Sequence, residues 1–308
     1  MNRIFNAVKL FILCGILFIS GKAAAAEVDA EAMEIFRETV MQTAKQDNRV
    51  FRQDILLIMP QCTAELEFMG ATERDKFNMT GVFEMWMVND NGKVDYTEKP
   101  FYLTQDKQNM VVYFQNEKKK WQKSTTPVSA ANLVDMVTTP NAQELDKMIE
   151  FVKDVTILQE SETRRTLLVK IDCAKIFESI KAEMAKDPEI QKMANNETVN
   201  SFVSYIETGF KNADVWYTWT VDKINWQTVT MSFNLSSLPQ NIASAVLNDS
   251  SQPLTSVPEI REILENLAFY SEFKGYTTFL NEDARANLEI PKKVLKAKEV
   301  KPSDDAKK

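Results

Sequence analysis

The absence of histidine limits the chemistry that this chain could carry out. Without it, neither Ser-His-Asp nor Cys-His catalysis is possible, and the histidine-based zinc motifs are excluded as well. The seven glycines form no phosphate-binding pattern, so no nucleotide cofactor is indicated. A carboxylate pair could hydrolyse a glycosidic bond, but 44 aspartates and glutamates single out no pair. The sequence therefore predicts a protein that is not an enzyme and needs no cofactor or metal, with a carboxylate-based hydrolase as a rival.

Two thiols, Cys62 and Cys173, remain if the N-terminal segment described below is removed. An even pair of cysteines in an exported chain favours a disulfide. Such a bridge would close a loop of about 110 residues and stabilise the fold by restricting the unfolded chain. The alternative is two buried free thiols, because a large domain does not need a bridge and this spacing carries no signature.

The residues that could bind a ligand are apolar and recur at every second position. The clearest run spans residues 77–87, where Phe77, Met79, Phe83, Met85 and Met87 share one face of a predicted strand. The same alternation adds Met110, Val112, Phe114, Val229, Met231 and Phe233. Methionine is flexible and polarizable, so such faces could form the wall of a pocket for acyl chains. The alternative is ordinary core, filled by helices packed on the strands.

The first 26 residues have the pattern of a signal peptide. A basic start precedes an apolar run at residues 10–19, and a small-residue cleavage site ends at Ala26. The run is shorter than the roughly 20 residues that span a bilayer. Lipid attachment at Cys14 is not predicted, because Leu13 precedes it inside the run. We expect a mature protein that is exported to the periplasm or the cell exterior and has no transmembrane segment.

Strands adjoin strands in two blocks, and each block is preceded by helix. The predicted helices cover residues 29–46, 129–137, 142–152, 173–186, 189–209 and 258–267. The predicted strands cover residues 49–60, 63–69, 77–87, 101–104, 109–115, 119–123, 155–160, 164–171, 215–222, 228–235, 269–280 and 286–290. Residues 239–253 are rich in polar and turn-forming residues and are expected to be a connection. This order predicts an antiparallel sheet with two halves rather than a doubly wound one.

The layout resembles the periplasmic lipoprotein-carrier superfamily, which includes LolA, LolB and the LppX-like lipid-binding lipoproteins. Three features carry the resemblance: a helix feeding a long strand at 31–60, an aromatic-ended hairpin at 111–123, and closing segments at 276–291 that end in Ile290-Pro291. The resemblance implies an α+β fold, a curved antiparallel sheet (half-barrel) with helices across its concave face. The chain is longer than LolA and lacks the lipobox of LolB and LppX.

In this reading residues 27–291 form a single half-barrel domain with a helical insertion at about 129–210, and residues 292–308 form a charged, flexible tail. The resemblance implies an exported lipid- or lipoprotein-binding carrier or sensor with an apolar cleft on the concave face. Its partner would be a hydrophobic ligand, either a lipid or an acyl chain. The alternative is a protein–protein interaction module of the cell envelope with a filled core. The net charge of −7 argues against nucleic acid as a partner.

Overall fold

The computed structural model describes residues 29–44, 48–73, 76–89, 91–105, 108–127, 149–184, 197–249 and 257–300. The predicted signal peptide at 1–26 lies outside these residues. So does nearly all of the region 129–152, where two helices were predicted.

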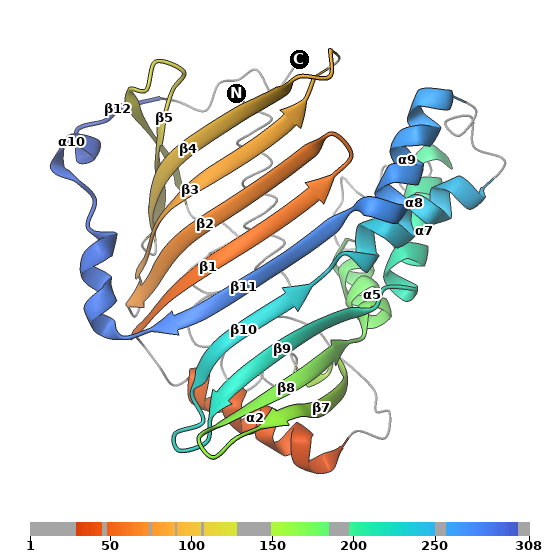
Figure 1. The fold of residues 1–308 in the computed structure, drawn as a ribbon, viewed down its shortest axis with the longest axis horizontal. Helices are drawn as coiled ribbons and strands as arrows, with labels where there is room; N and C mark the ends of the chain where they lie inside the picture. Colours follow the sequence, from red (N-terminus) through yellow and green to blue (C-terminus); the bar gives the residue numbers. More distant parts are fainter. Residues whose placement is uncertain are drawn as a thin grey trace.

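A single twelve-stranded sheet organises the described part of the chain (Figure 1). Its strand order is β12-β6-β5-β4-β3-β2-β1-β11-β10-β9-β8-β7. All neighbours are antiparallel except β12, which pairs with β6 in parallel. The strands are β1 (Asn48–Met59), β2 (Cys62–Glu73), β3 (Lys76–Val88), β4 (Val94–Gln105), β5 (Asn109–Gln115), β6 (Trp121–Pro127), β7 (Val152–Glu160), β8 (Arg164–Ile171), β9 (Val215–Asp222), β10 (Thr228–Asn234), β11 (Glu272–Leu280) and β12 (Lys298–Glu299).

The two predicted blocks of strands meet where β1 pairs with β11. Their register runs from Val50 opposite Leu280 to Ile58 opposite Glu272, so the first and last long strands of the chain lie side by side. The other neighbours among β1–β11 are consecutive in sequence, as in a meander. One sheet therefore forms from two meanders, which confirms the predicted antiparallel sheet with two halves.

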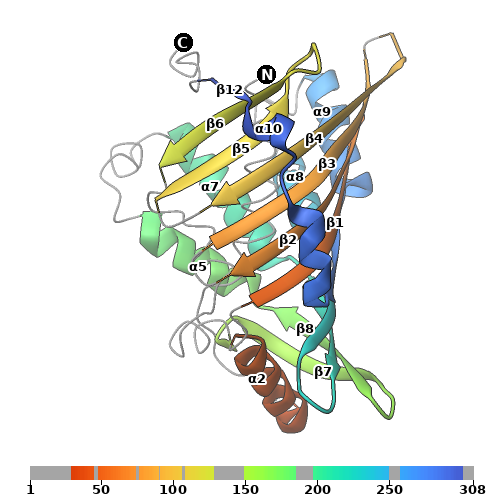
Figure 2. The same ribbon diagram turned by 90° about the vertical axis from the view of Figure 1, so that its left-hand side faces the viewer.

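The helices lie against this sheet rather than forming a separate layer on both faces. They are α2 (Ala30–Ala44), α5 (Cys173–Met184), α7 (Glu197–Lys211), α8 (Ser237–Asn248), α9 (Pro258–Tyr270), the 3-10 helix η3 (Glu282–Leu288) and α10 (Lys292–Leu295). Figure 2 shows the sheet curving toward the side on which α5 and α7 lie. The fold class is thus α+β, an open and curved antiparallel sheet with helices on its concave side, as predicted.

Three boundaries differ from the sequence-based expectation. The region 129–210, expected to be a helical insertion, also contains the two strands predicted at 155–160 and 164–171, which form one edge of the sheet as β7 and β8. Residues 239–253 contain most of α8, whose Pro239 falls in the first helical turn, where proline is tolerated. The strand expected at 286–290 is largely replaced by η3, because Leu288 packs with Val50 and Ala71 on the outer face of the sheet.

The first part of the predicted charged tail, residues 292–300, is held against the sheet. Residues 292–300 carry α10 and β12, and Val294 is fully buried. The Glu299 carboxylate accepts a hydrogen bond from the backbone of Thr125 (2.9 Å) and lies 3.6 Å from Lys123 Nζ. These contacts fasten the segment to the β6 edge of the sheet.

The disulfide considered between Cys62 and Cys173 is absent from the structure, in which both are free thiols. Cys62 begins β2, while Cys173 begins α5 directly after β8, and β1, β11, β10 and β9 lie between these two strands. A bridge requires the two Cα atoms to lie within about 7 Å of each other. Burial raises the pKa of the Cys173 thiol to about 12, so it stays protonated and packs as a small apolar side chain.

Candidate ligand-binding face

The predicted wall residues, apart from Val229, lie together on the concave face of the sheet. On one half, Met79 opposes Leu103, which opposes Val112; on the other, Ile55 opposes Gly275, which opposes Phe233. Side chains alternate along a strand, so every second residue shares this face. Cys173 and Phe210, from the helical side, pack into the same cluster. Val229 sits at a register shift between Thr228 and Thr230, so the alternation does not place it.

Burial of the wall residues decreases along β3. Phe77 is 1% exposed and Phe83 is 4% exposed, whereas Met85 is partly buried and Met87 is 44% exposed. On the neighbouring strands Met110 and Val112 are also only partly buried. Phe77, Met79, Phe83 and Phe233 are therefore core residues, whereas Met85, Met87, Met110 and Val112 keep surface that a ligand could cover.

Two glycines on the concave face allow an aromatic ring to approach the backbone of a neighbouring strand. A Cβ atom at Gly275 would collide with the ring of Phe233, and one at Gly70 would collide with the ring of Phe51. Each ring thus occupies the space above a glycine on a neighbouring strand. Close approach to backbone is a reason for glycine within a strand. The rings therefore cover backbone that a side chain at the glycine position would otherwise cover.

Several residues of this face were not singled out from the sequence. Leu57 on β1 and Phe273 and Phe279 on β11 are partly buried and pack against the same cluster. Phe51, Ile55 and Leu57 follow the alternation, which was the available signal. Polar Gln53 on this face, and apolar Leu56 and Ile58 on the outer face, make the strand look less regular than β3. What sequence could not supply was the pairing of β1 with β11, which brings the two apolar faces together.

Helices α7 and α8 pack closely against each other. Gly209 of α7 approaches Ile242 of α8 so tightly that a Cβ atom would not fit. Within α9, by contrast, no residue is buried, and Ile263 is exposed. The Gln240 amide, in α8, donates to the Ser271 carbonyl (2.8 Å) and so ties α8 to the chain just before β11. α7 and α8 are thus held together, whereas α9 buries none of its side chains.

Exposed apolar side chains gather at one end of the strands, which we call the apolar rim. It comprises Met59, Met87, Val88, Val94, Tyr96, Phe269 and Tyr270. Val88 opposes Val94 at the end of the β3–β4 hairpin, and Tyr270 ends α9 two residues before Glu272, which opposes Ile58 of β1. Met87 belongs to both the rim and the concave face, so the two surfaces are continuous. Exposed apolar patches of this kind commonly mark interaction sites.

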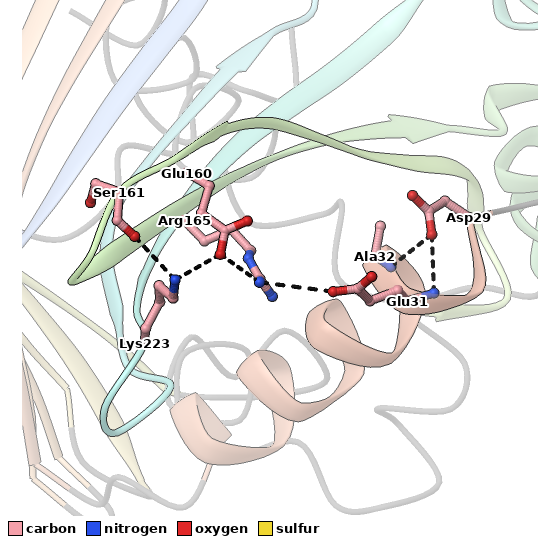
Figure 3. Close-up of polar contacts among 7 residues, drawn as sticks. All are labelled: Asp29, Glu31, Ala32, Glu160, Ser161, Arg165 and Lys223. Atoms are coloured by element: carbon pink, nitrogen blue, oxygen red, sulfur yellow. Dashed lines mark hydrogen bonds and ion pairs between the residues drawn. The ribbon is translucent and has the colours of Figure 1, made fainter.

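A polar network fastens α2 over the other end of the concave face (Figure 3). Arg165 donates to Glu160 (2.7 Å) and lies 3.8 Å from Glu31 of α2, and Lys223 also donates to Glu160 (2.7 Å). Hydrogen bonds from Lys223 and then Arg165 lower the pKa of the Glu160 carboxyl. Asp29 caps α2 by accepting from the backbone N–H groups of Glu31 and Ala32. This arrangement is structural, because it clamps a helix onto a hairpin.

The outer face of the sheet has a different character. Arg52 forms an ion pair with Glu67 (2.9 Å), and Tyr96 donates a hydrogen bond to Glu84, which raises the pKa of the Tyr96 hydroxyl to about 12.

In the described ranges, no group of three or more cysteine or acidic side chains could hold a metal ion. Among the helices that the structure describes, none is both long and apolar enough to cross a membrane.

Comparison with known proteins yields a likeness of fold. No protein-family model matches the chain, and no curated protein matches it in sequence. A similar solved structure is that of LprF from Mycobacterium bovis, which is 11% identical in sequence, with a TM-score of 0.38. The aligned region covers 83% of this chain and 94% of LprF. The fold class therefore rests on the observed sheet. It is an open antiparallel half-barrel whose two halves join where β1 pairs with β11, with helices on its concave side.

Proposed function

We propose that this protein is an exported carrier or sensor that binds a lipid or an acyl chain on the concave face of its sheet. The observation that carries the proposal is the gradient on this face from fully buried Phe77 to exposed Met87. An ordinary core would bury all of these side chains, whereas a surface that receives hydrocarbon leaves part of its wall accessible. Partly buried Met85 and Met110 supply flexible side chains that adapt to chains of different shape.

The apolar rim supports the same proposal, because it offers a route by which a hydrocarbon chain could reach the concave face. Because Met87 joins the rim to the concave face, a hydrocarbon chain arriving at the strand ends meets apolar side chains throughout its path inward. Export follows from the signal peptide predicted at residues 1–26. An exported protein that works between membranes would meet lipids or acylated proteins as its natural ligands.

Native mass spectrometry of gently purified protein tests the proposal first. We expect adducts with the masses of lipids, which are lost after extraction with organic solvent and restored by incubation with phospholipid. A protein that carries no adduct and takes up neither fatty acids nor phospholipids would contradict the proposal.

A matched pair of variants then locates the site on one face of β3. Met85 lies on the concave face and Val82 on the outer face, and both are partly buried. Met85→Gln should weaken binding about tenfold, because loss of apolar contact of about 1.4 kcal/mol corresponds to that factor. Val82→Gln should leave the affinity unchanged. Displacement of a fluorescent naphthylamine probe measures both.

The rival function is a protein–protein interaction module with a filled core. It is favoured by the burial of Phe77, Met79, Phe83 and Phe233 and by the rings that lie over Gly70 and Gly275. Chemical cross-linking in the cell envelope separates the two functions. A stoichiometric protein partner together with an absence of bound lipid would favour the rival.

A further inference from the structure

Two polar side chains lie side by side in the middle of the apolar concave face. Thr277 of β11 directly opposes Gln53 of β1 in the antiparallel register, and both point to the concave side. Their neighbours on the same face are apolar: Phe51, Ile55, Phe68, Met231, Gly275 and Phe279. A polar pair in these surroundings needs a physical explanation, since apolar residues would pack there at lower cost.

The Thr277 hydroxyl is the more informative of the two. Thr277 is 4% exposed, and its Oγ1 atom is buried without a hydrogen-bond partner in the described structure. Buried polar atoms in folded proteins almost always have a partner, so an exception points to a group that is supplied from outside. Gln53 is only partly buried and so retains an amide that a ligand could contact.

The chemistry of the pair selects a neutral ligand group. A hydroxyl and a carboxamide can both donate to a carbonyl oxygen. A free carboxylate would be buried among apolar neighbours without a counter-charge, which is costly. Arg49 lies on the same face but four residues before Gln53, about 13 Å along the strand at roughly 3.3 Å per residue.

We infer that Thr277 and Gln53 form a subsite for the carbonyl group of an ester- or amide-linked acyl chain. This inference rests on the proposed function and adds the class of ligand. The hydroxyl is buried in the structure, and Met231, which opposes Thr277 on β10, is partly buried and unbranched. Its side chain can swing aside when the acyl chain enters. The hydrocarbon then lies along the apolar strands with its carbonyl at the centre of the sheet.

A pair of ligands that differ by one carbonyl tests the inference. We would measure binding of 1-palmitoylglycerol, an ester, and 1-O-hexadecylglycerol, the matching ether, to delipidated protein. The wild type should bind the ester 2- to 10-fold more tightly, roughly the range that one or two net hydrogen bonds provide. Thr277→Val keeps the shape of the side chain and should bring this ratio closer to one, because only Gln53 then remains as a donor, without changing the affinity for the ether.

Two further variants of β11 act as controls. Thr278→Val, on the outer face of the same strand, should keep the preference for the ester, and so should Thr277→Ser, which retains the hydroxyl. Equal binding of ester and ether by the wild type, or an unchanged preference in Thr277→Val, would overturn the subsite while leaving the proposed function intact. If the wild type binds neither amphiphile nor the naphthylamine probe, the proposed function fails, and the subsite with it.

Discussion

Two parts of one concave face are covered to different extents. At the α2 end, defined here by Phe36, Val155, Leu167 and Val169, every side chain is at most 2% exposed. In the middle, across β5, β3, β1 and β11, buried core residues such as Phe77 and Phe83 lie beside side chains that are only partly buried, namely Leu57, Met85, Met110, Val112 and Phe279. Both parts consist of alternating apolar strands, and the register places them on the same side of the sheet.

The difference comes from what lies over the strands. A single amphipathic helix, α2, puts its apolar side directly on β7, β8 and β9, and Phe36 makes an edge-to-face contact with Trp219. α7, α8 and α9, by contrast, lie beside the strand ends (Figure 1), where α7 and α8 approach each other closely and α9 buries none of its residues. The comparison teaches that the α2 end supplies stability, while the middle retains the surface on which we propose a ligand binds.

The largest expected effect is on stability at the α2 end. Leu167→Ala should lower the free energy of unfolding by about 3 kcal/mol, because Leu167 is fully buried and the cavity cannot collapse under α2. Met85→Ala should cost about 1 kcal/mol or less, since part of that side chain already faces solvent. Urea unfolding measures both. Equal losses would show that the middle is as closed as the α2 end.

A smaller loss of stability is expected when the polar network that holds α2 to the β7–β8 hairpin, here called the clamp, is disrupted. Arg165→Met removes the contacts to Glu160 and Glu31 and should lower the free energy of unfolding by less than about 1 kcal/mol, because both carboxylates are exposed to solvent. Amide exchange should accelerate in α2 and stay unchanged in β3. Equal acceleration in both would mean that the network supports the whole sheet.

The clamp should also depend on pH through Glu160. Hydrogen bonds from Lys223 and Arg165 lower the pKa of this carboxyl below its ordinary value of 4.5, so its stabilising contribution is complete above that value and is lost as pH falls through the lowered pKa. Unfolding curves of wild type and Glu160→Gln should therefore differ at pH 7 and converge at strongly acidic pH. A difference that persists there would contradict an ionic origin.

The smallest effect on stability is expected at the apolar rim. Met87→Ser should change the free energy of unfolding by less than about 0.5 kcal/mol, because Met87 is already exposed. Uptake of lipid from vesicles by the delipidated variant should nevertheless slow several-fold. Unchanged uptake would show that the rim does not lie on the route by which the ligand reaches the concave face.

Much of the sheet was predictable from local pattern. The strand expected at 109–115 is β5 with the same bounds, and the strand expected at 77–87 is extended by one residue at each end to form β3. α8 was missed because proline and uncharged polar residues in its sequence resemble a turn. The bulge beside Val229 was equally invisible, because an added residue alters the register without altering the residue types.

Periodicity in the sequence determined which side chains share a face of each strand, because alternation is a local property of the extended backbone. It could not determine how far that face is covered. The pairing of β1 with β11, the seating of α2 on β7–β9 and the burial of the Thr277 hydroxyl all join residues far apart in the chain. Only tertiary structure decides such contacts, because they depend on the relative placement of whole elements.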